Sequence, residues 1–377
     1  MPTSSRSSLA SSRSSLVASG AAIALVLGLA GTASATARPA ADGLAAPTAL
    51  ATTASTLFVA NHATSTLTLL NAASGAFEGI VSARVLGVHA PTAMAASAAK
   101  SWHTVLVASA GGANRAFAVT PKGSGVRLRA LSTRPFAGCA KGAAVALSTD
   151  AAGQFVALCS NGVVDVYDGR TAALVRTLPA STTHLAAATA LSVVGGAIYV
   201  TVSAAGASPA PSAVAHEGVY EVSLATGAPL ASITNATCAS CGFLGPDGIA
   251  FSQGQLWVAD ATNSQATELA TGPMSFLATQ TSNLYNTGAV LAYGSTVFLA
   301  SPDGPGSSMV TRFSGSPSSF QWMMCNTNGP YRFDNPSSLV IANGDVLNPR
   351  VLWVANPADN LLDEMDVTTG ALVRTVS

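Results

Sequence analysis

Four carboxylate and amide side chains stand at the starts of short apolar segments, where their oxygens could hold a metal ion. They are Asp247 in GPDGIAF, Asn286 in YNTGAV, and Asp334 and Asn335 in FDNPSS. Oxygen ligands of this kind suit Ca²⁺ or Mg²⁺, and a bound divalent ion would polarise a substrate carbonyl. Asp and Asn before a strand also form turns with their own backbone. The residues therefore leave two interpretations open, a divalent-metal site and a set of local turns.

Cysteines are the second group of residues that could do chemistry. In an exported chain, clustered cysteines predict structural disulfides, and an odd number leaves one thiol over. Cys238 could pair with Cys241, or either of them with Cys325. The functional alternative is that CASC, residues 238–241, is a redox-active CxxC motif, although no thioredoxin-like βαβ pattern surrounds it. The full set is Cys139, Cys159, Cys238, Cys241 and Cys325.

Histidines and aromatic residues in loop-like segments could contact a ligand. The histidines show no metal-binding spacing, so solvated loop side chains are the simpler interpretation. The aromatic residues occur in SFQWMMCNTNGPYRF, and their rings could stack on a sugar or a peptide. The candidate binding residues are His62, His89, His184, His216, Trp322, Tyr331 and Phe333.

Composition and motifs argue against several functions. Only 9% of the residues are charged, the formal net charge is zero, and no run of Lys or Arg occurs. The basic footprint that a nucleic-acid backbone requires is therefore missing, and we expect no nucleic-acid partner. The sequence also has no GxSxG, HExxH, Walker loop or GxGxxG before a helix, which weighs against several large enzyme classes.

The first 35 residues are typical of a secretory signal peptide. Arg6 and Arg13 lie in a Ser-rich segment, an apolar run follows at 16–30, and Ala33-Ser34-Ala35 predicts cleavage near Ala35. This run is too short to favour a membrane anchor, and no cysteine follows it to carry a lipid. We therefore expect a secreted, extracellular chain with no membrane anchor after cleavage. A second apolar stretch, at 185–206, contains a Gly-Gly pair that predicts a β-hairpin.

To position these residues, the chain repeats one unit. A short apolar strand recurs seven times: LFVAN at 57, VLVAS at 105, FVALC at 155, IYVTV at 198, LWVAD at 256, VFLAS at 297 and LWVAN at 352. Another apolar run precedes each copy. The better-preserved copies are followed by a third run, a Gly-containing turn and a fourth segment, as in LLDEMDVTTGALVRTV. Four short strands in a unit of roughly 48 residues are the signature of propeller blades.

Other architectures fit the repeat less well. A helical repeat needs an apolar period near 3.6 over ten or more residues, whereas these runs are short and end in Gly, Asn, Asp or Pro. A β-sandwich has no reason to repeat its motif seven times. The sequence therefore predicts an all-β fold, a seven-bladed β-propeller of four-stranded antiparallel sheets over residues 46–377, after a short linker at 36–45. Six or eight blades remain alternatives, because the second, fourth and sixth copies depart from the pattern.

The units VANxxxNxLxxxDxxTGxLVRTV and PDGIAFSxGQLWVAD resemble YVTN-type and NHL-type β-propeller repeats. The resemblance covers residues 46–377 and implies a ring of four-stranded sheets around a channel. It implies no single activity, because such propellers serve as scaffolds, binders and enzymes. Gluconolactonase-like and streptogramin-lyase-like propellers carry a divalent metal or a catalytic group near the channel mouth, and Asp247, Asn286, Asp334 and Asn335 match that place by position only.

The repeat sorts the loops onto two faces. In a blade with strands A to D, the B–C turn and the D–A connection lie on the same face. All five cysteines, four of the five histidines and the insertion at 203–218 map to that face, whereas His103 maps to the other. Cys139 and Cys159 flank the A–B hairpin of the third blade from one side and form the favoured disulfide pair. Asn61, Asp260 and Asn356 are expected to cap B–C turns.

Two functions remain open from the sequence. The first is a non-catalytic scaffold that binds a protein, peptide or glycan partner on the cysteine-bearing face. The alternative is a divalent-metal-dependent lactonase or lyase. No swapped strand is evident to close the ring, so residues 36–45, a disulfide or side-chain packing must do so.

Overall fold

The computed structural model describes residues 43–53, 55–82, 87–99, 102–109, 115–122, 125–132, 138–139, 144–203, 217–302, 308–315, 318–327, 329–343 and 350–377. The predicted signal peptide, the linker up to residue 42, His216 and most of the 203–218 insertion lie outside these residues. No helix in these ranges has the length and apolarity needed to cross a membrane.

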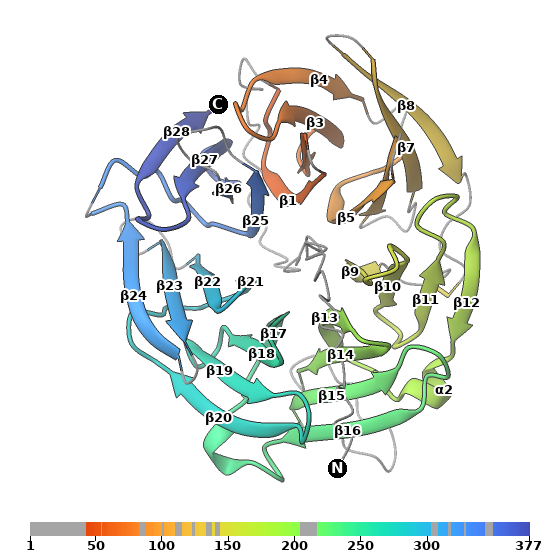
Figure 1. The fold of residues 1–377 in the computed structure, drawn as a ribbon, viewed down its shortest axis with the longest axis vertical. Helices are drawn as coiled ribbons and strands as arrows, with labels where there is room; N and C mark the ends of the chain where they lie inside the picture. Colours follow the sequence, from red (N-terminus) through yellow and green to blue (C-terminus); the bar gives the residue numbers. More distant parts are fainter. Residues whose placement is uncertain are drawn as a thin grey trace, which may run out of the picture.

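Seven antiparallel four-stranded sheets form a ring (Figure 1). Blade 1 consists of β1 (Pro47–Thr52), β2 (Thr56–Asn61), β3 (Thr66–Asn71) and β4 (Phe77–Val81). Blade 2 consists of β5 (Pro91–Ala99), β6 (Trp102–Ser109), β7 (Arg115–Lys122) and β8 (Gly125–Ser132). Blade 3 consists of β9 (Ala144–Thr149), β10 (Phe155–Cys159), β11 (Val164–Tyr167) and β12 (Leu174–Leu178).

The remaining four blades repeat this order. Blade 4 consists of β13 (Ala188–Val194), β14 (Ala197–Val202), β15 (Gly218–Ser223) and β16 (Pro229–Thr234). Blade 5 consists of β17 (Pro246–Ser252), β18 (Gln255–Asp260), β19 (Gln265–Ala270) and β20 (Ser275–Gln280). Blade 6 consists of β21 (Ala289–Tyr293), β22 (Thr296–Ser301), β23 (Met309–Gly315) and β24 (Ser318–Cys325). Blade 7 consists of β25 (Ser338–Asn343), β26 (Arg350–Asn356), β27 (Leu361–Asp366) and β28 (Leu372–Val376).

Helical structure in the described ranges is confined to two single turns. They are α2 (Ala180–Thr183) and the 3-10 turn η2 (Ala239–Cys241), each in a connection between blades. The prediction of an all-β propeller with seven blades is therefore confirmed. The Gly195–Gly196 hairpin is confirmed as well, because both glycines have positive φ and join β13 to β14.

The apolar repeat forms the second strand of every blade, and burial explains its continuity. β2, TLFVAN, is buried along its whole length, and β26 is buried at every position after Arg350. A strand with sheets packed on both faces needs apolar residues without alternation. The outermost strands β4 and β28 are mostly exposed or half-buried, because they form the edge of their sheets.

The turns between third and fourth strands account for the D-x-x-T-G pattern. The Asp366 carboxylate accepts hydrogen bonds from the backbone N–H groups of Thr368 and Thr369 and from the Thr369 hydroxyl. Asp168 makes the equivalent contacts in blade 3. Gly370 has a φ of +74°, which a residue with a side chain rarely adopts.

Side-chain packing closes the ring between blades 7 and 1, which lie side by side (Figure 1). Each of these blades is built from one continuous part of the chain, so no strand is exchanged. Trp353 is fully buried at this junction, and its indole Nε1 donates to the carbonyl oxygen of Ala72 at 3.1 Å. The backbone N–H of Leu50 donates to the Ser338 hydroxyl oxygen at 3.1 Å. Leu44 also packs among the buried residues of this junction.

Candidate functional site

The candidate site is the face of the ring that carries the connections into each blade. We call it the connection face, and the described parts of its connections are residues 43–46, 82, 87–90, 138–139, 179–187, 235–245, 281–288, 326–327 and 329–337. The turns between second and third strands lie on the same face.

Buried polar side chains pin these connections to the blades. In four blades the residue that ends the second strand is fully buried, and its oxygen accepts a hydrogen bond from a backbone N–H of the connection before it. We call this contact a pin. The four pins are Ala45 N to Asn61 Oδ1 at 3.1 Å, His89 N to Ser109 Oγ at 3.1 Å, Leu244 N to Asp260 Oδ2 at 2.7 Å and Tyr285 N to Ser301 Oγ at 3.3 Å.

Two further blades pin the connection from the third strand. The carboxylate of Asp165 on β11 accepts from the N–H of Gly138 at 2.7 Å, and that of Asp363 on β27 accepts from the N–H of Arg332 at 3.4 Å. Burial raises the pKa of Asp363, and its hydrogen bonds, the strongest from the Thr375 hydroxyl, oppose this effect. The pins therefore recur around the ring although the residue that makes them changes.

Four of the six pinned residues present their side chains to solvent, whereas Ala45 is buried and Gly138 has no side chain. At these four positions a buried apolar residue directly precedes the pinned residue in the sequence. These preceding residues are Val88, Phe243, Leu284 and Tyr331. The next residue is exposed, with Leu244 at 51% and Tyr285 at 48%. The exposed residues at pinned positions are His89, Leu244, Tyr285 and Arg332. A rigid frame thus displays an imidazole, an aliphatic side chain, a phenol and a guanidinium at equivalent points.

Blade 3 adds a covalent link to its pin. Cys139 and Cys159 form a disulfide, which confirms the predicted pair. Cys159 ends β10, and the 20-residue separation equals that between His89 and Ser109 in blade 2. The disulfide therefore stands where another blade has a hydrogen bond. Both sulfurs and the Asp165 carboxylate lie within 4.8 Å of one another, and all three residues are buried.

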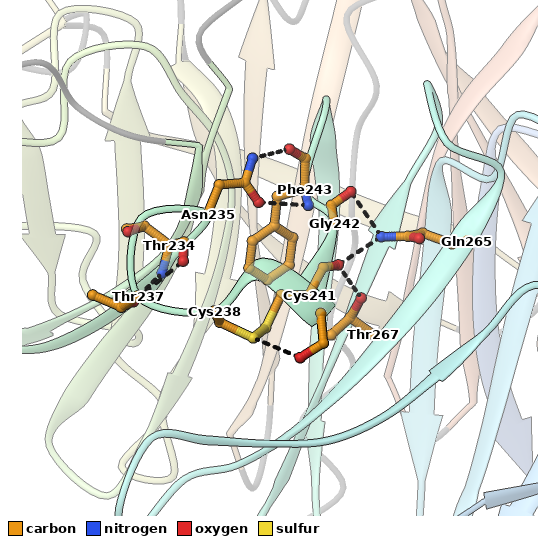
Figure 2. Close-up of a disulfide and its surroundings, with 10 residues drawn as sticks. Thr234, Asn235, Thr237, Cys238, Cys241, Gly242, Phe243, Gln265 and Thr267 are labelled. Atoms are coloured by element: carbon orange, nitrogen blue, oxygen red, sulfur yellow. Dashed lines mark hydrogen bonds between the residues drawn. A yellow bond between two sulfur atoms is a disulfide. The ribbon is translucent and has the colours of Figure 1, made fainter.

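The second disulfide joins Cys238 to Cys241 in the connection before blade 5 (Figure 2). This connection is held independently of its disulfide. Asn235 and Phe243 exchange hydrogen bonds, the Asn235 amide donating to the Phe243 carbonyl and its oxygen accepting from the Phe243 N–H at 2.8 Å. The Gln265 amide donates to the carbonyl oxygens of Cys241 and Gly242 at 2.8 and 3.0 Å.

A cleft opens beside this second disulfide. It has a volume of about 640 Å³ and lies between β16, the turn η2 and the start of β20. Its lining includes Cys238, Thr237, Met274 and Phe276. Cys325, the remaining cysteine, is buried and lies outside both disulfides.

Asp247 lies at the start of the innermost strand of blade 5, next to the pin Asp260. Burial raises the pKa of Asp247 to about 8, and the negative charge of Asp260 adds to the shift. The Asp247 Oδ1 atom is buried without a hydrogen-bond partner. At the corresponding place in blades 1 and 4, Thr48 and Thr189 donate their hydroxyls to the carbonyls of Pro91 and Pro246, which lie in the first strand of the following blade, β5 or β17. Asp247 thus places a carboxyl where those blades have a hydroxyl.

Asn286 and Asn335 occupy positions of unusual backbone geometry. Both have positive φ, at +45° and +58°, which Asn tolerates better than most residues. Their backbone N–H groups donate to Ser264 and Ser308 in the preceding blades, at 2.9 and 3.4 Å. Ala46 and Ala90 have the same geometry, so a local structural role accounts for these positions without a ligand.

The predicted metal-site residues are not gathered into one acidic cluster in the described ranges. The only group there of three or more His, Cys, Asp or Glu ligand atoms is the one around Cys139. Burial raises the pKa of Asp334, helped by the charge of Asp359. A divalent ion at Asp247, Asn286, Asp334 and Asn335 therefore stays a prediction.

Three of the predicted rim histidines are exposed on the connection face, and one of them is pinned. His62, His89 and His184 are exposed, and His62 Nδ1 lies 3.4 Å from the carbonyl oxygen of Pro91. His184 has a positive φ and ends α2. The side chain of His103, which was assigned to the opposite face, lies outside the described residues.

The three predicted aromatic rim residues pack between blades 6 and 7. Phe333 is fully buried and stacks on the Tyr331 ring at 5.2 Å. The Tyr331 hydroxyl donates to the carbonyl of Gly370 at 2.6 Å, and Trp322 Nε1 donates to that of Thr368 at 3.1 Å. Tyr331 and Phe333 therefore anchor the connection before blade 7, whereas Trp322 is half-buried on β24.

The sequence predicted only one of the two roles of the pin residue Asp260. Asp260 does cap its B–C turn, because its Oδ1 accepts from the N–H of Asn263 at 3.0 Å. Its second oxygen pins Leu244 and Gly245, a role that the sequence did not indicate. The recurrent polar residue after the VA dipeptide was the available signal.

Comparisons with known proteins support the propeller fold and do not indicate a function. No protein-family model matches the chain, and no curated protein does. The chain is similar to the solved structure of Kuenenia stuttgartiensis hydrazine synthase, with a TM-score of 0.63 and 13% identity, covering 90% of this chain and 100% of that one. It is also similar to the computationally designed Ika8 protein, with a TM-score of 0.51 and 16% identity, covering 89% and 88%. BamB from Moraxella catarrhalis matches with a TM-score of 0.48 and 11% identity, covering 90% and 86%. At these identities the likeness shows the propeller fold alone.

Proposed function

We propose that this chain is an exported, non-catalytic binding propeller whose connection face holds a protein, peptide or glycan partner. The observation that carries the proposal is the set of pinned positions, where exposed His89, Leu244, Tyr285 and Arg332 stand on backbone fixed by buried polar groups. Binding surfaces gain affinity when their side chains are already ordered, because less conformational entropy is lost on association. Two disulfides support export, since such bonds persist mainly in oxidising compartments.

The side chains at the pinned positions favour an uncharged ligand, or one with both apolar and polar groups. Leu244 and Tyr285 hold equivalent positions in consecutive blades and offer exposed apolar surface, while His89 and Arg332 add polar contacts. Tyr and Arg are enriched among the residues that dominate interface energies. A peptide or a sugar with both apolar and polar faces fits this combination.

The test probes peptide and glycan arrays with the oxidised, folded protein. Leu244→Ser combined with Tyr285→Ser should lower binding to any ligand found by at least about tenfold. The matched control is Tyr293→Ser, because Tyr293 is 39% exposed in the same blade but ends β21 on the opposite face. Equal loss in both variants, or no ligand on either array, would contradict the proposal.

The second candidate is the metal-dependent lactonase or lyase, which the unpartnered Oδ1 of Asp247 favours. A thermal melt with Ca²⁺, Mg²⁺ and chelator tests it, because a ligand specific to the native state raises Tm. A rise that chelator reverses and that Asp247→Ala abolishes would favour this enzyme. A Tm that does not change with either ion would exclude the metal-dependent enzyme.

A further inference from the structure

The Cys238–Cys241 disulfide differs from its counterpart in what it contributes to the fold. It closes a ring with a sequence separation of only 3, so it restricts the unfolded chain little. The connection around it is already fixed by Asn235, Gln265 and Asp260 through hydrogen bonds to Phe243, Cys241 and Leu244. Opening the S–S bond would therefore leave the connection in place.

Its two sulfurs are also unequal in access. Cys241 is fully buried, whereas Cys238 is 9% exposed and lines the 640 Å³ cleft. In blade 3, by contrast, Cys139 and Cys159 are buried to 1% and 0% exposure. A thiol that enters the cleft meets the sulfur of Cys238 first.

We propose that the Cys238–Cys241 disulfide is a thiol-exchange site that reacts with cysteine thiols of a peptide or protein bound in this cleft. The proposal goes beyond the binding function and does not depend on it. None of the described residues lining the cleft is charged, and the lining combines hydroxyls such as Thr237 and Ser240 with the apolar Met274 and Phe276. An uncharged peptide segment carrying cysteine matches this surface.

The reaction balances without an added oxidant. The partner thiolate attacks Cys238 Sγ, a new S–S bond forms, and the bond between Cys238 and Cys241 breaks. Cys241 Sγ leaves with the electron pair and takes up a proton. A second thiol of the partner then attacks the partner's own sulfur in the mixed disulfide and releases the Cys238 thiol. The partner dithiol is oxidised to a disulfide, and this chain's disulfide is reduced to a dithiol.

The hydroxyl of Ser240 is positioned to assist the released sulfur. Ser240 Oγ lies 3.6 Å from Cys238 Sγ, within the range of a hydrogen bond to sulfur. A hydroxyl that donates to a thiolate stabilises the charged form. Ser240 is thus a positioning residue for the Cys238 thiolate.

The first experiment incubates the folded, oxidised chain with reduced glutathione and reads each cysteine by differential alkylation and peptide mass spectrometry. We expect Cys238–Cys241 to be reduced at least about tenfold faster than Cys139–Cys159, with little change in Tm. Equal rates, or reduction of Cys238–Cys241 only as fast as the whole protein unfolds, would overturn the proposal.

A pair of single variants then tests the direction of attack. Cys241→Ser leaves the thiol of Cys238, and Cys238→Ser leaves that of Cys241, in otherwise identical chains. With oxidised glutathione as the probe, the Cys238 thiol should form the mixed disulfide at least about tenfold faster. A Cys241 thiol that reacts as fast would contradict the proposed access from the cleft. Loss of ligand binding in the Leu244 and Tyr285 variant leaves both readouts unchanged, so the two proposals fail separately.

Discussion

Blades 3 and 5 fix the same kind of connection by different chemistry. In blade 3 a disulfide from Cys159 to Cys139 holds it, together with the carboxylate of Asp165. In blade 5 the buried carboxylate of Asp260 holds Leu244, and the disulfide of that connection lies to one side. The disulfide carries no charge, whereas the charge of Asp260 adds to the rise that burial causes in the pKa of its neighbour Asp247. The difference shows that a disulfide and a carboxylate can both hold a connection, and that only the carboxylate also changes the electrostatics of its neighbours.

Breaking the covalent pin should have the largest effect on stability. Cys139→Ser with Cys159→Ser opens a loop with a sequence separation of 20, and we expect the free energy of unfolding to fall by about 3 kcal/mol. Chemical denaturation in urea measures it. A loss well below 1 kcal/mol would show that Asp165 alone holds the connection.

Removing the electrostatic pin comes next. Asp260→Ala leaves the buried N–H groups of Leu244 and Gly245 without their acceptor, and we expect a loss of about 2 kcal/mol. The milder Ser301→Ala removes one pin, that of Tyr285, and should cost about 1 kcal/mol. If both variants lose the same amount, the carboxylate is not the stronger pin.

Opening the second disulfide should cost less stability than removing the Asp260 pin or opening the first disulfide. Cys238→Ser with Cys241→Ser removes a link of sequence separation 3, and the expected loss is below about 2 kcal/mol. Denaturation under the conditions used for the Cys139 and Cys159 variant gives a direct comparison. A loss larger than that of the first disulfide would reverse the assignment of roles.

The last effect is the pH dependence that Asp247 gives to stability. Its pKa in the folded state is raised from 3.8 to about 8, so the folded chain holds the proton more tightly than the unfolded chain. Folding is therefore favoured at low pH and loses this contribution as the pH rises from about 4 to about 8. Asp247→Asn removes the titration and should therefore raise Tm by more at pH 8 than at pH 5. An equal change in Tm at the two pH values would contradict the raised pKa.

The sequence predicted the fold from the second strands, because their unbroken apolar runs are fixed by burial on both faces. The Gly195–Gly196 hairpin and the Cys139–Cys159 pair followed from the same repeat. The pins did not, because Asn61, Ser109 and Asp260 share only the ability to accept a hydrogen bond, and their partners lie 16 to 20 residues away in connections without a pattern.

The aromatic residues show a second limit of sequence reasoning. Tyr331 and Phe333 lie in a connection and were expected at the rim, yet the connection needs apolar anchors between blades 6 and 7. Sequence position in a loop therefore does not separate anchors from exposed residues. The residue directly after each anchor, such as Arg332 or Leu244, is exposed. It can be recognised as exposed only once the position of the anchor in the connection is known.

The rigidity of the connection face is most directly tested by hydrogen exchange at the pinned amides of His89, Leu244, Tyr285 and Arg332. NMR or mass spectrometry would compare their rates with those of amides in the second strands. We predict exchange as slow as that of the strands, because each N–H donates to a buried oxygen while its side chain faces solvent. Exchange at the rate of an unprotected loop would contradict the pinned frame on which the proposed binding face depends.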